Sequence, residues 1–323
     1  MGRVLIVKIW GKRLFILGCI VFIILISSSY YFYYLAIQRG EKKFLEGNED
    51  LEVSAQAMEE FIAGDWRNWV QKQSFQDMTL TSFDDLKLKG YFLEAKQPTN
   101  KLVIFAHGYL GHGKQMGLFG QYYYEQLGYH IFMPDLRGHG ESEGAYYGFG
   151  WHDRLDLIGW TDLLIDKLGE DTDIIYHGLS MGAATVLMAS GETLPPQVKA
   201  MIADSPYSDV YQLFEYQMDR MFHLPAFPLL DLTSVITDIK ADYTLKEASA
   251  LKQVTKAQVP ILYIHGENDT FVPTDMTREL AEHTSSPHIV WTVPHANHGE
   301  AFVLEKESYI QNIQTFLSKY VND

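Results

Sequence analysis

The sequence predicts an α/β domain with a mostly parallel, eight-stranded sheet, helices on both of its faces and a transmembrane helix in front of it. From about Gln73, apolar segments of strand length alternate with segments of helical periodicity, which is typical of a parallel sheet with helical crossovers. Before this region, Leu14 to Ile37 form an uncharged run of 24 residues, and about 20 residues suffice to span a bilayer. With 47% hydrophobic residues, the 323-residue chain can bury a large core.

Charge is distributed unevenly along the chain. Residues 1–39 contain five basic residues and no acidic one, and because the net charge of the whole chain is −15, residues 40–323 carry −20. A domain this acidic repels phosphate groups, so nucleic acid is not expected among its partners.

Residue types that commonly hold metals are sparse. The single cysteine, Cys19, lies inside the apolar N-terminal run, so the remainder of the chain has no disulfide, no thiol nucleophile and no cysteine-based metal site. The twelve histidines include no H-E-x-x-H pair, which speaks against a zinc protease. We expect neither a metal nor an organic cofactor.

The first 72 residues divide by composition into three segments. Residues 1–13 form a basic flank. Residues 14–37 form a transmembrane anchor that ends in an aromatic belt from Tyr30 to Tyr34, and residues 38–72 form a helical stalk or an extension lying on the main domain. No small-residue cleavage site follows the apolar run, which favours an uncleaved anchor over a signal peptide, and a buried helix is the other alternative.

Basic residues are more numerous before the anchor than after it. The positive-inside rule then places the N-terminus in the cytoplasm and the acidic domain outside the cell, although the difference in charge is small. We therefore expect a single-pass protein of the cell membrane with an extracellular domain.

Residues 73–323 form the α/β domain in this interpretation. The strands are predicted at a hairpin within Ser74–Ala95 and at Lys101–Ala106, Tyr129–Met133, Asp173–His177, Val198–Ala203, Val259–His265 and His288–Val293. Helices are predicted at Gln115–Leu127, Trp151–Leu168, from Gly182 onward and at Ser308–Tyr320.

The alternation of strands and helices breaks at about residues 207–256. This block is rich in methionine and aromatic residues and predicts a small helical cap inserted over the sheet. A lid over an apolar pocket and ordinary packing of inserted helices remain alternatives.

The stretch Gly178-Leu179-Ser180-Met181-Gly182 directly follows a predicted buried strand and precedes a helix that begins with small residues. A strand, a sharp turn and a helix in this order expose the Ser180 hydroxyl at the tip of the turn, above the end of the sheet. The pattern alone has a considerable chance background, but this context favours a nucleophilic serine.

A serine nucleophile needs a base and a carboxylate that orients the base. Asp269 follows the strand Val259–His265, at the sheet edge where functional groups collect, and is the candidate acid. His298 follows the last predicted strand and is the candidate base, with His295 as a competitor.

An oxyanion hole needs two backbone N–H donors. Met181, directly after the nucleophile, is predicted to supply one. The glycine-rich loop after Lys101–Ala106 is predicted to supply the other from Tyr109, with Leu110 as the alternative.

Five landmarks of this chain resemble the α/β-hydrolase superfamily: His107-Gly108, the Arg137–Ser142 segment, Gly178–Gly182, Asp269 and His298. The resemblance covers about residues 75–320. Within the superfamily the chain is similar to the serine-aminopeptidase-like and monoglyceride-lipase-like branch, and especially to membrane-anchored, uncharacterised hydrolases of Gram-positive bacteria. This resemblance implies an α/β-hydrolase fold and an enzyme from a group of carboxylesterases, lipases, thioesterases and peptidases. The Arg137 loop marks the family without an assigned chemical role.

We expect a serine hydrolase that cleaves carboxylic esters through an acyl-enzyme, acting on a small-molecule ester with an apolar acyl group. An aminopeptidase, amidase or thioesterase could use the same triad, and an aminopeptidase would need a carboxylate for the free amine, such as Glu215 or Asp219. A catalytically silent binding protein is the alternative from another class, but such proteins usually lose a triad residue. Acyl-chain length and leaving group are not readable from the sequence.

Overall fold

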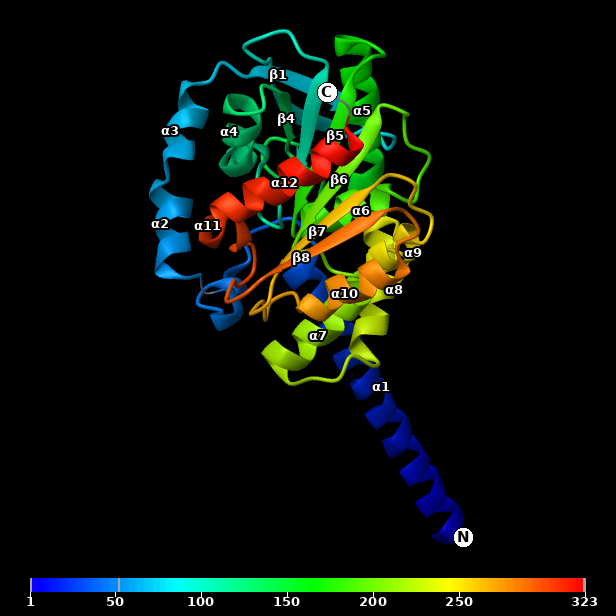
Figure 1. Cartoon of the computed structure of the whole chain (residues 1–323). Helices are drawn as coiled ribbons and strands as arrows, with labels where there is room; N and C mark the ends of the chain where they lie inside the picture. Colours follow the sequence, from blue (N-terminus) through cyan, green and yellow to red (C-terminus); the bar gives the residue numbers. More distant parts are fainter. Residues whose placement is uncertain (1, 52, 322–323) are drawn as a thin grey trace.

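The computed structural model describes residues 2–51 and 53–321 and is built around one eight-stranded sheet (Figure 1). The strand order is β1-β2-β4-β3-β5-β6-β7-β8, and only the β1–β2 and β2–β4 pairs are antiparallel. The strands are β1 (Gln76–Thr81), β2 (Lys87–Leu93), β3 (Lys101–Ala106), β4 (His130–Pro134), β5 (Asp173–Leu179), β6 (Val198–Asp204), β7 (Ile261–Gly266) and β8 (His288–Val293). The predicted fold class is confirmed.

Helices cover both faces of this sheet. Successive side chains of β3 alternate between two apolar cores, Leu102 and Ile104 on one face and Val103 and Phe105 on the other, because side chains alternate along a strand. The first core packs under α5 (Asp153–Leu168), α6 (Met181–Ala189) and α10 (Thr274–His283); the second packs under α4 (Gly117–Glu125), α11 (Ala301–Leu304) and α12 (Lys306–Tyr320). The helix predicted at Gln115–Leu127 is thus shorter, and a 3-10 turn, η3 (Gly113–Met116), precedes it.

The N-terminal helix α1 (Gly2–Ala36) projects from one end of the domain (Figure 1). Within the described residues, its 28-residue segment Ile9–Ala36 is the one stretch long and apolar enough to cross a membrane, and its most apolar 18-residue window has a mean hydropathy of 2.3. These properties fit a membrane anchor and also a signal sequence. The last turns of α1 are nevertheless part of the domain, because Ser29, Tyr33 and the following Ile37 are buried.

Residues 38–51 and 53–72 lie against the domain. They form η1 (Lys43–Leu45), η2 (Glu49–Leu51), α2 (Ala55–Ala63) and α3 (Asp65–Lys72). Trp66 and Trp69 of α3 are buried in the second core beside α4. This segment therefore adds apolar area to the domain instead of holding it away from α1.

Three helices lie between β6 and β7: α7 (Val210–Phe222), α8 (Leu229–Ala241) and α9 (Ala250–Val254). Asp209 caps α7, because its carboxylate accepts hydrogen bonds from the first-turn amides of Tyr211 and Gln212. In Figure 1, α7 and α8 lie at the end of the molecule from which α1 emerges. The cap and the last turns of α1 thus meet over the carboxyl ends of the strands.

Arg137, which the sequence marks without assigning a role, is a buried structural residue. Its guanidinium donates to both carboxylate oxygens of Asp156 on α5, at 2.7 and 2.8 Å, and to Asp84 in the β1–β2 turn at 2.9 Å. The side chain of Arg137 is fully buried, and that of Asp156 is 3% exposed. This ion cluster fixes the loop after β4 to α5 and to the hairpin.

We predict that Arg137→Ala lowers the free energy of unfolding by about 3–5 kcal/mol, because it leaves the carboxylate of Asp156 buried without its partner. Urea denaturation in detergent micelles measures this change. The exposed pair Lys246–Asp231, at 2.9 Å, is the matched control, and Lys246→Ala is expected to cost no more than about 1 kcal/mol. Equal effects of the two substitutions would contradict the assigned role of Arg137.

Candidate active site

Ser180 occupies the sharp turn between β5 and α6. Its backbone angles, φ 55° and ψ −116°, are uncommon for a residue with a side chain. Two hydrogen bonds hold this conformation: the Ser180 amide donates to the carbonyl of Asp204 at 2.8 Å, and its carbonyl accepts from Ala184 at 3.0 Å. The turn places the hydroxyl at the carboxyl end of the central strands.

The two glycines of the pattern allow the turn to close. A Cβ on Gly178 would lie 2.2 Å from the carbonyl oxygen of Gly182, and a Cβ on Gly182 would lie 1.9 Å from the carbonyl oxygen of Ala106. Both distances are far below van der Waals contact, so any side chain would push α6 away from β5 and β3.

Ser180, His298 and Asp269 form a hydrogen-bonded chain. The distance from Ser180 Oγ to His298 Nε2 is 2.8 Å, and the distance from His298 Nδ1 to Asp269 Oδ2 is 2.7 Å. The loop after β7 carries Asp269, and the loop after β8 carries His298, so neighbouring parallel strands bring them together. His295, the competing base, is exposed and has a left-handed backbone with φ 64°.

The pKa values of the pair shift in opposite directions. Burial raises the pKa of the Asp269 carboxyl, but the nearby His298 and hydrogen bonds from His265 and His298 outweigh burial and hold it well below its ordinary range. Burial likewise lowers the pKa of His298, but the Asp269 carboxylate outweighs it and raises this pKa above the ordinary 6.5. Asp269 therefore stays ionised and favours a proton on His298.

Asp269 is fixed by further donors. Its Oδ1 accepts from the amides of Phe271 and Val272, at 3.0 and 2.8 Å. Its Oδ2 lies 3.0 Å from Nε2 of His265, a nitrogen that also faces the carbonyl of Val272 at 2.9 Å. Because both neighbours of Nε2 are acceptors, this nitrogen carries the hydrogen, and His265 holds Asp269 in place.

Three further residues around the site, His265, Asp204 and Glu300, carry no functional signal in the sequence. His265 stands at the end of a predicted strand. Asp204 is fully buried, accepts from Tyr309 at 2.9 Å, and burial raises its pKa to about 6. The buried Glu300 accepts from the amide of Asn297 at 2.9 Å and so braces the loop that carries His298. Their roles depend on contacts between distant segments, and no local pattern signals them.

The loop after β3 packs directly against the turn at Ser180. A Cβ on Gly108 would lie 3.5 Å from the Cβ of Ser180. Tyr109 follows Gly108 and lines the same cavity as Ser180 and Met181. Met181 is the first residue of α6, where backbone amides have no acceptor within the helix. Leu110, the alternative donor, is 41% exposed and does not line the cavity.

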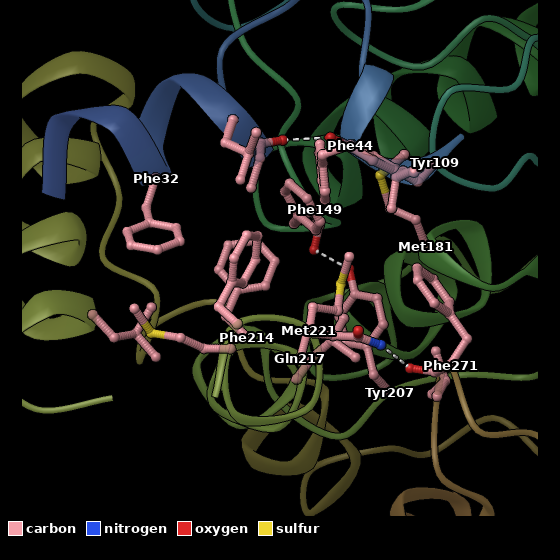
Figure 2. Close-up of a pocket in the computed structure, with 18 of the residues that line it drawn as sticks. Phe32, Phe44, Tyr109, Phe149, Met181, Tyr207, Phe214, Gln217, Met221 and Phe271 are labelled. Carbon is pink, nitrogen blue, oxygen red and sulfur yellow. Dashed lines mark hydrogen bonds between the residues drawn. The ribbon is translucent and has the colours of Figure 1, made fainter. Parts of the chain in front are cut away.

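An apolar cavity lies over the Ser180 hydroxyl. Its volume is about 100 Å³, and its lining is almost entirely apolar. In Figure 2, Phe32 of α1 extends into one side of the cavity, Met181 and Phe271 lie at the other side, and Phe149 and Phe214 lie between them. The wall is therefore formed by α1, the cap and the loops at the sheet edge together.

Among the described residues, no carboxylate lines this cavity. Glu215 and Asp219, the candidates for binding a substrate amine, are exposed residues of α7 and do not line it. Gln217 does line the cavity and donates to the carbonyl of Phe271 (Figure 2). Within residues 2–51 and 53–321, no group of three or more histidine, cysteine or acidic side chains is arranged to hold a metal ion.

Comparison with known families and structures points to serine hydrolases. The family model described as serine aminopeptidase, S33 matches residues 97–232, and the model described as serine hydrolase (FSH1) matches residues 186–298. The esterase Pf2001 of Pyrococcus furiosus has a similar fold, with a TM-score of 0.63 and 23% identity over 79% of this chain and 96% of the esterase.

Similar sequences include proteins of bacteria and eukaryotes. The uncharacterised protein YqkD of Bacillus subtilis is 28% identical over 78% of this chain and 83% of its own length. An uncharacterised membrane protein of Saccharomyces cerevisiae, YNL320W, is 22% identical over 75% of this chain and 79% of its own length. The lysophosphatidylserine lipase ABHD12 of Danio rerio is 26% identical over 59% of this chain and 49% of its own length. Together with the sheet topology, these matches show an α/β-hydrolase fold and support a serine hydrolase.

Proposed function

We propose that this enzyme hydrolyses carboxylic esters with an apolar acyl group, using Ser180 as nucleophile, His298 as general base and Asp269 as the orienting acid. The observation that carries the proposal is the hydrogen-bonded chain from Ser180 through His298 to Asp269 at 2.8 and 2.7 Å, directly beneath an apolar cavity. The backbone amides of Tyr109 and Met181 form the oxyanion hole.

In the first half of the reaction, Ser180 Oγ attacks the ester carbonyl carbon and its proton passes to His298 Nε2. The negative charge that develops on the carbonyl oxygen is stabilised by the two amides. The bond to the alcohol oxygen then breaks, and His298 gives its proton to that oxygen. In the second half, water loses a proton to His298 and attacks the acyl-enzyme, and Ser180 regains its proton as the acid leaves.

The cavity lining favours esters over aminoacyl amides. A free substrate amine carries a positive charge at neutral pH, and burying that charge without a counterion is costly. Since Glu215 and Asp219 are exposed on α7, outside the cavity, neither neutralises such an amine. A thioester carries no such charge, so it would fit the same apolar wall and is the closest alternative substrate.

The proposal includes an uncleaved, single-pass membrane anchor with the catalytic domain outside the cell. Burial of Tyr33 and Ile37 in the domain supports retention of the helix, because cleavage after the apolar run would remove both side chains and open the core. The larger number of basic residues before the anchor supports the orientation.

Ser180→Ala is predicted to lower the hydrolysis of p-nitrophenyl esters by roughly 10⁴- to 10⁶-fold, because the nucleophile is lost. Circular dichroism should show an unchanged fold. A fluorophosphonate probe should label the wild-type enzyme at Ser180 and leave the variant unlabelled. Wild-type activity in the variant would refute the assignment, and an intact wild-type protein that resists labelling would favour a silent binding protein.

A substrate panel tests the preference for esters. We expect kcat/KM for p-nitrophenyl esters to exceed that for aminoacyl p-nitroanilides by about 100-fold or more, because the cavity offers no partner for a free amine. Glu215→Gln and Asp219→Asn, which change exposed carboxylates, should leave both values unchanged. Faster amide cleavage that depends on either carboxylate would replace the proposal with an aminopeptidase.

The pH dependence follows from the raised pKa of His298. Only neutral His298 can accept the proton of Ser180, so kcat/KM should fall as the pH decreases through a midpoint above 6.5. Asp269→Asn removes the carboxylate that raises this pKa, so the midpoint should move to lower pH, while kcat drops roughly 10⁴-fold. A flat profile from about pH 5 to pH 8 would exclude His298 as the base.

A further inference from the structure

The helix that can cross a membrane also forms part of the cavity wall. Phe32, Leu35 and Ala36 of α1 line the cavity, and Ser180 lines it as well. At this end of α1, the hydroxyl of Tyr109 donates to the carbonyl of Ala36 at 2.5 Å. The anchor therefore contacts the loop that is proposed to supply an oxyanion donor.

The length of α1 fixes where the domain lies relative to a bilayer. Arg13 is the last charged residue before the uncharged run. About 20 helical residues span the hydrocarbon core, so a count that starts at Leu14 ends near Tyr33. The domain already contacts the helix at Ser29, whose hydroxyl donates to the carbonyl of Leu229 at 3.2 Å. The start of α8 therefore lies roughly 6 Å inside the hydrocarbon boundary.

The loop that precedes α8 has the composition required at this depth. From Met221 to Leu230 the chain contains no acidic residue, lysine or arginine, although residues 40–323 carry a net charge of −20. Phe227 is 76% exposed and Leu224 is 38% exposed. On α1, Tyr30, Tyr31 and Tyr34 are also exposed, as expected for side chains at a membrane interface.

The same uncharged segment leads into the cavity. Met221 and Phe222, at the end of α7, both line it. The ring of Phe222 packs edge to face against the ring of Phe32, with centroids 5.3 Å apart. An apolar surface thus continues from the exposed loop, between α1 and α7, to the cavity that contains Ser180.

We propose that the loop 223–228 inserts into the outer part of one leaflet, and that the substrate is a single-chain or double-chain lipid ester whose acyl chain enters the cavity directly from that leaflet, along α1 and α7. This inference rests on the proposed ester hydrolysis at Ser180. The hydrophobic effect keeps Phe227 and Leu224 in the lipid, and the acyl chain passes from the leaflet to the cavity without exposure to water.

Depth-dependent quenching tests the position of the loop in the full chain. Cys19→Ala removes the single cysteine, and Phe227→Cys then carries an environment-sensitive fluorophore. Ser318→Cys is the control, because it is exposed on α12 near the C-terminus, away from the end where α1 emerges (Figure 1). In phosphatidylcholine vesicles, nitroxide on the acyl chains should quench the label at residue 227 and aqueous iodide the label at residue 318. Quenching of both labels by iodide alone would overturn the docking.

Kinetics test the entry of the acyl chain. With a long-chain fluorogenic ester in the same vesicles, Phe227→Asp should lower kcat/KM about ten-fold or more, because a carboxylate is costly in the hydrocarbon layer. Hydrolysis of water-soluble p-nitrophenyl acetate should not change. Lys246→Ala, a substitution at an exposed cap residue, should alter neither rate.

The two assays separate this inference from the proposed function. If the wild-type enzyme hydrolyses neither ester, the proposed function fails, and the quenching result still decides whether the loop is inserted. If Phe227→Asp leaves the long-chain ester unaffected while acetate is hydrolysed normally, entry from the leaflet is refuted and Ser180 chemistry stands.

Discussion

The backbone of Ser180 is the constraint on which the site depends. A residue other than glycine with φ 55° and ψ −116° costs about 1–3 kcal/mol in strain, and the surrounding structure has to supply that energy. Close packing supplies it, because α6 approaches β3 so tightly that Gly182 touches the backbone of Ala106. Relaxation of the turn would require separation of these elements, which the buried core opposes. The packed turn thus holds the hydroxyl 2.8 Å from His298 Nε2, which is the alignment that the proposed reaction needs.

Contacts with the N-terminal extension link the cap to the loop that carries Asp269. Asp50 pairs with Arg220 of α7 and accepts from the hydroxyl of Thr270 at 2.8 Å, one residue after Asp269. The hydroxyl of Tyr216, also on α7, donates to the carbonyl of Thr270 at 2.8 Å. A movement of α7 away from the sheet would therefore pull on the loop that carries Asp269. Opening of the cap would thus disturb the hydrogen-bonded chain from Ser180 to Asp269. In the proposed mechanism, an acyl chain that enters along α7 without lifting it leaves these hydrogen bonds intact.

Several parts of the molecule could be predicted because their signals are local. Alternating apolar segments predict the parallel sheet, and the glycines around Ser180 predict the turn, because each depends on residues close in sequence. Asp269 and His298 could be selected because parallel strands bring the ends of consecutive strands to one edge. The burial of Tyr33 could not be predicted, since an apolar helix has the same composition against lipid as against protein. Arg137, His265 and Glu300 likewise depend on partners distant in sequence, and only the folded chain identifies them.

The hydrogen bond between Tyr109 and Ala36 makes the end of α1 part of the folded domain, so the domain cannot be separated from this helix without damage to the cavity. A truncated chain that starts after the apolar helix, the common route to a soluble domain, would lose Tyr33, Ile37 and one wall of the cavity. Rates of hydrolysis measured with that truncated chain would then report on a cavity that lacks one wall. For the same reason, a substitution in the last turns of α1 changes the wall of the cavity over Ser180 as well as the helix itself.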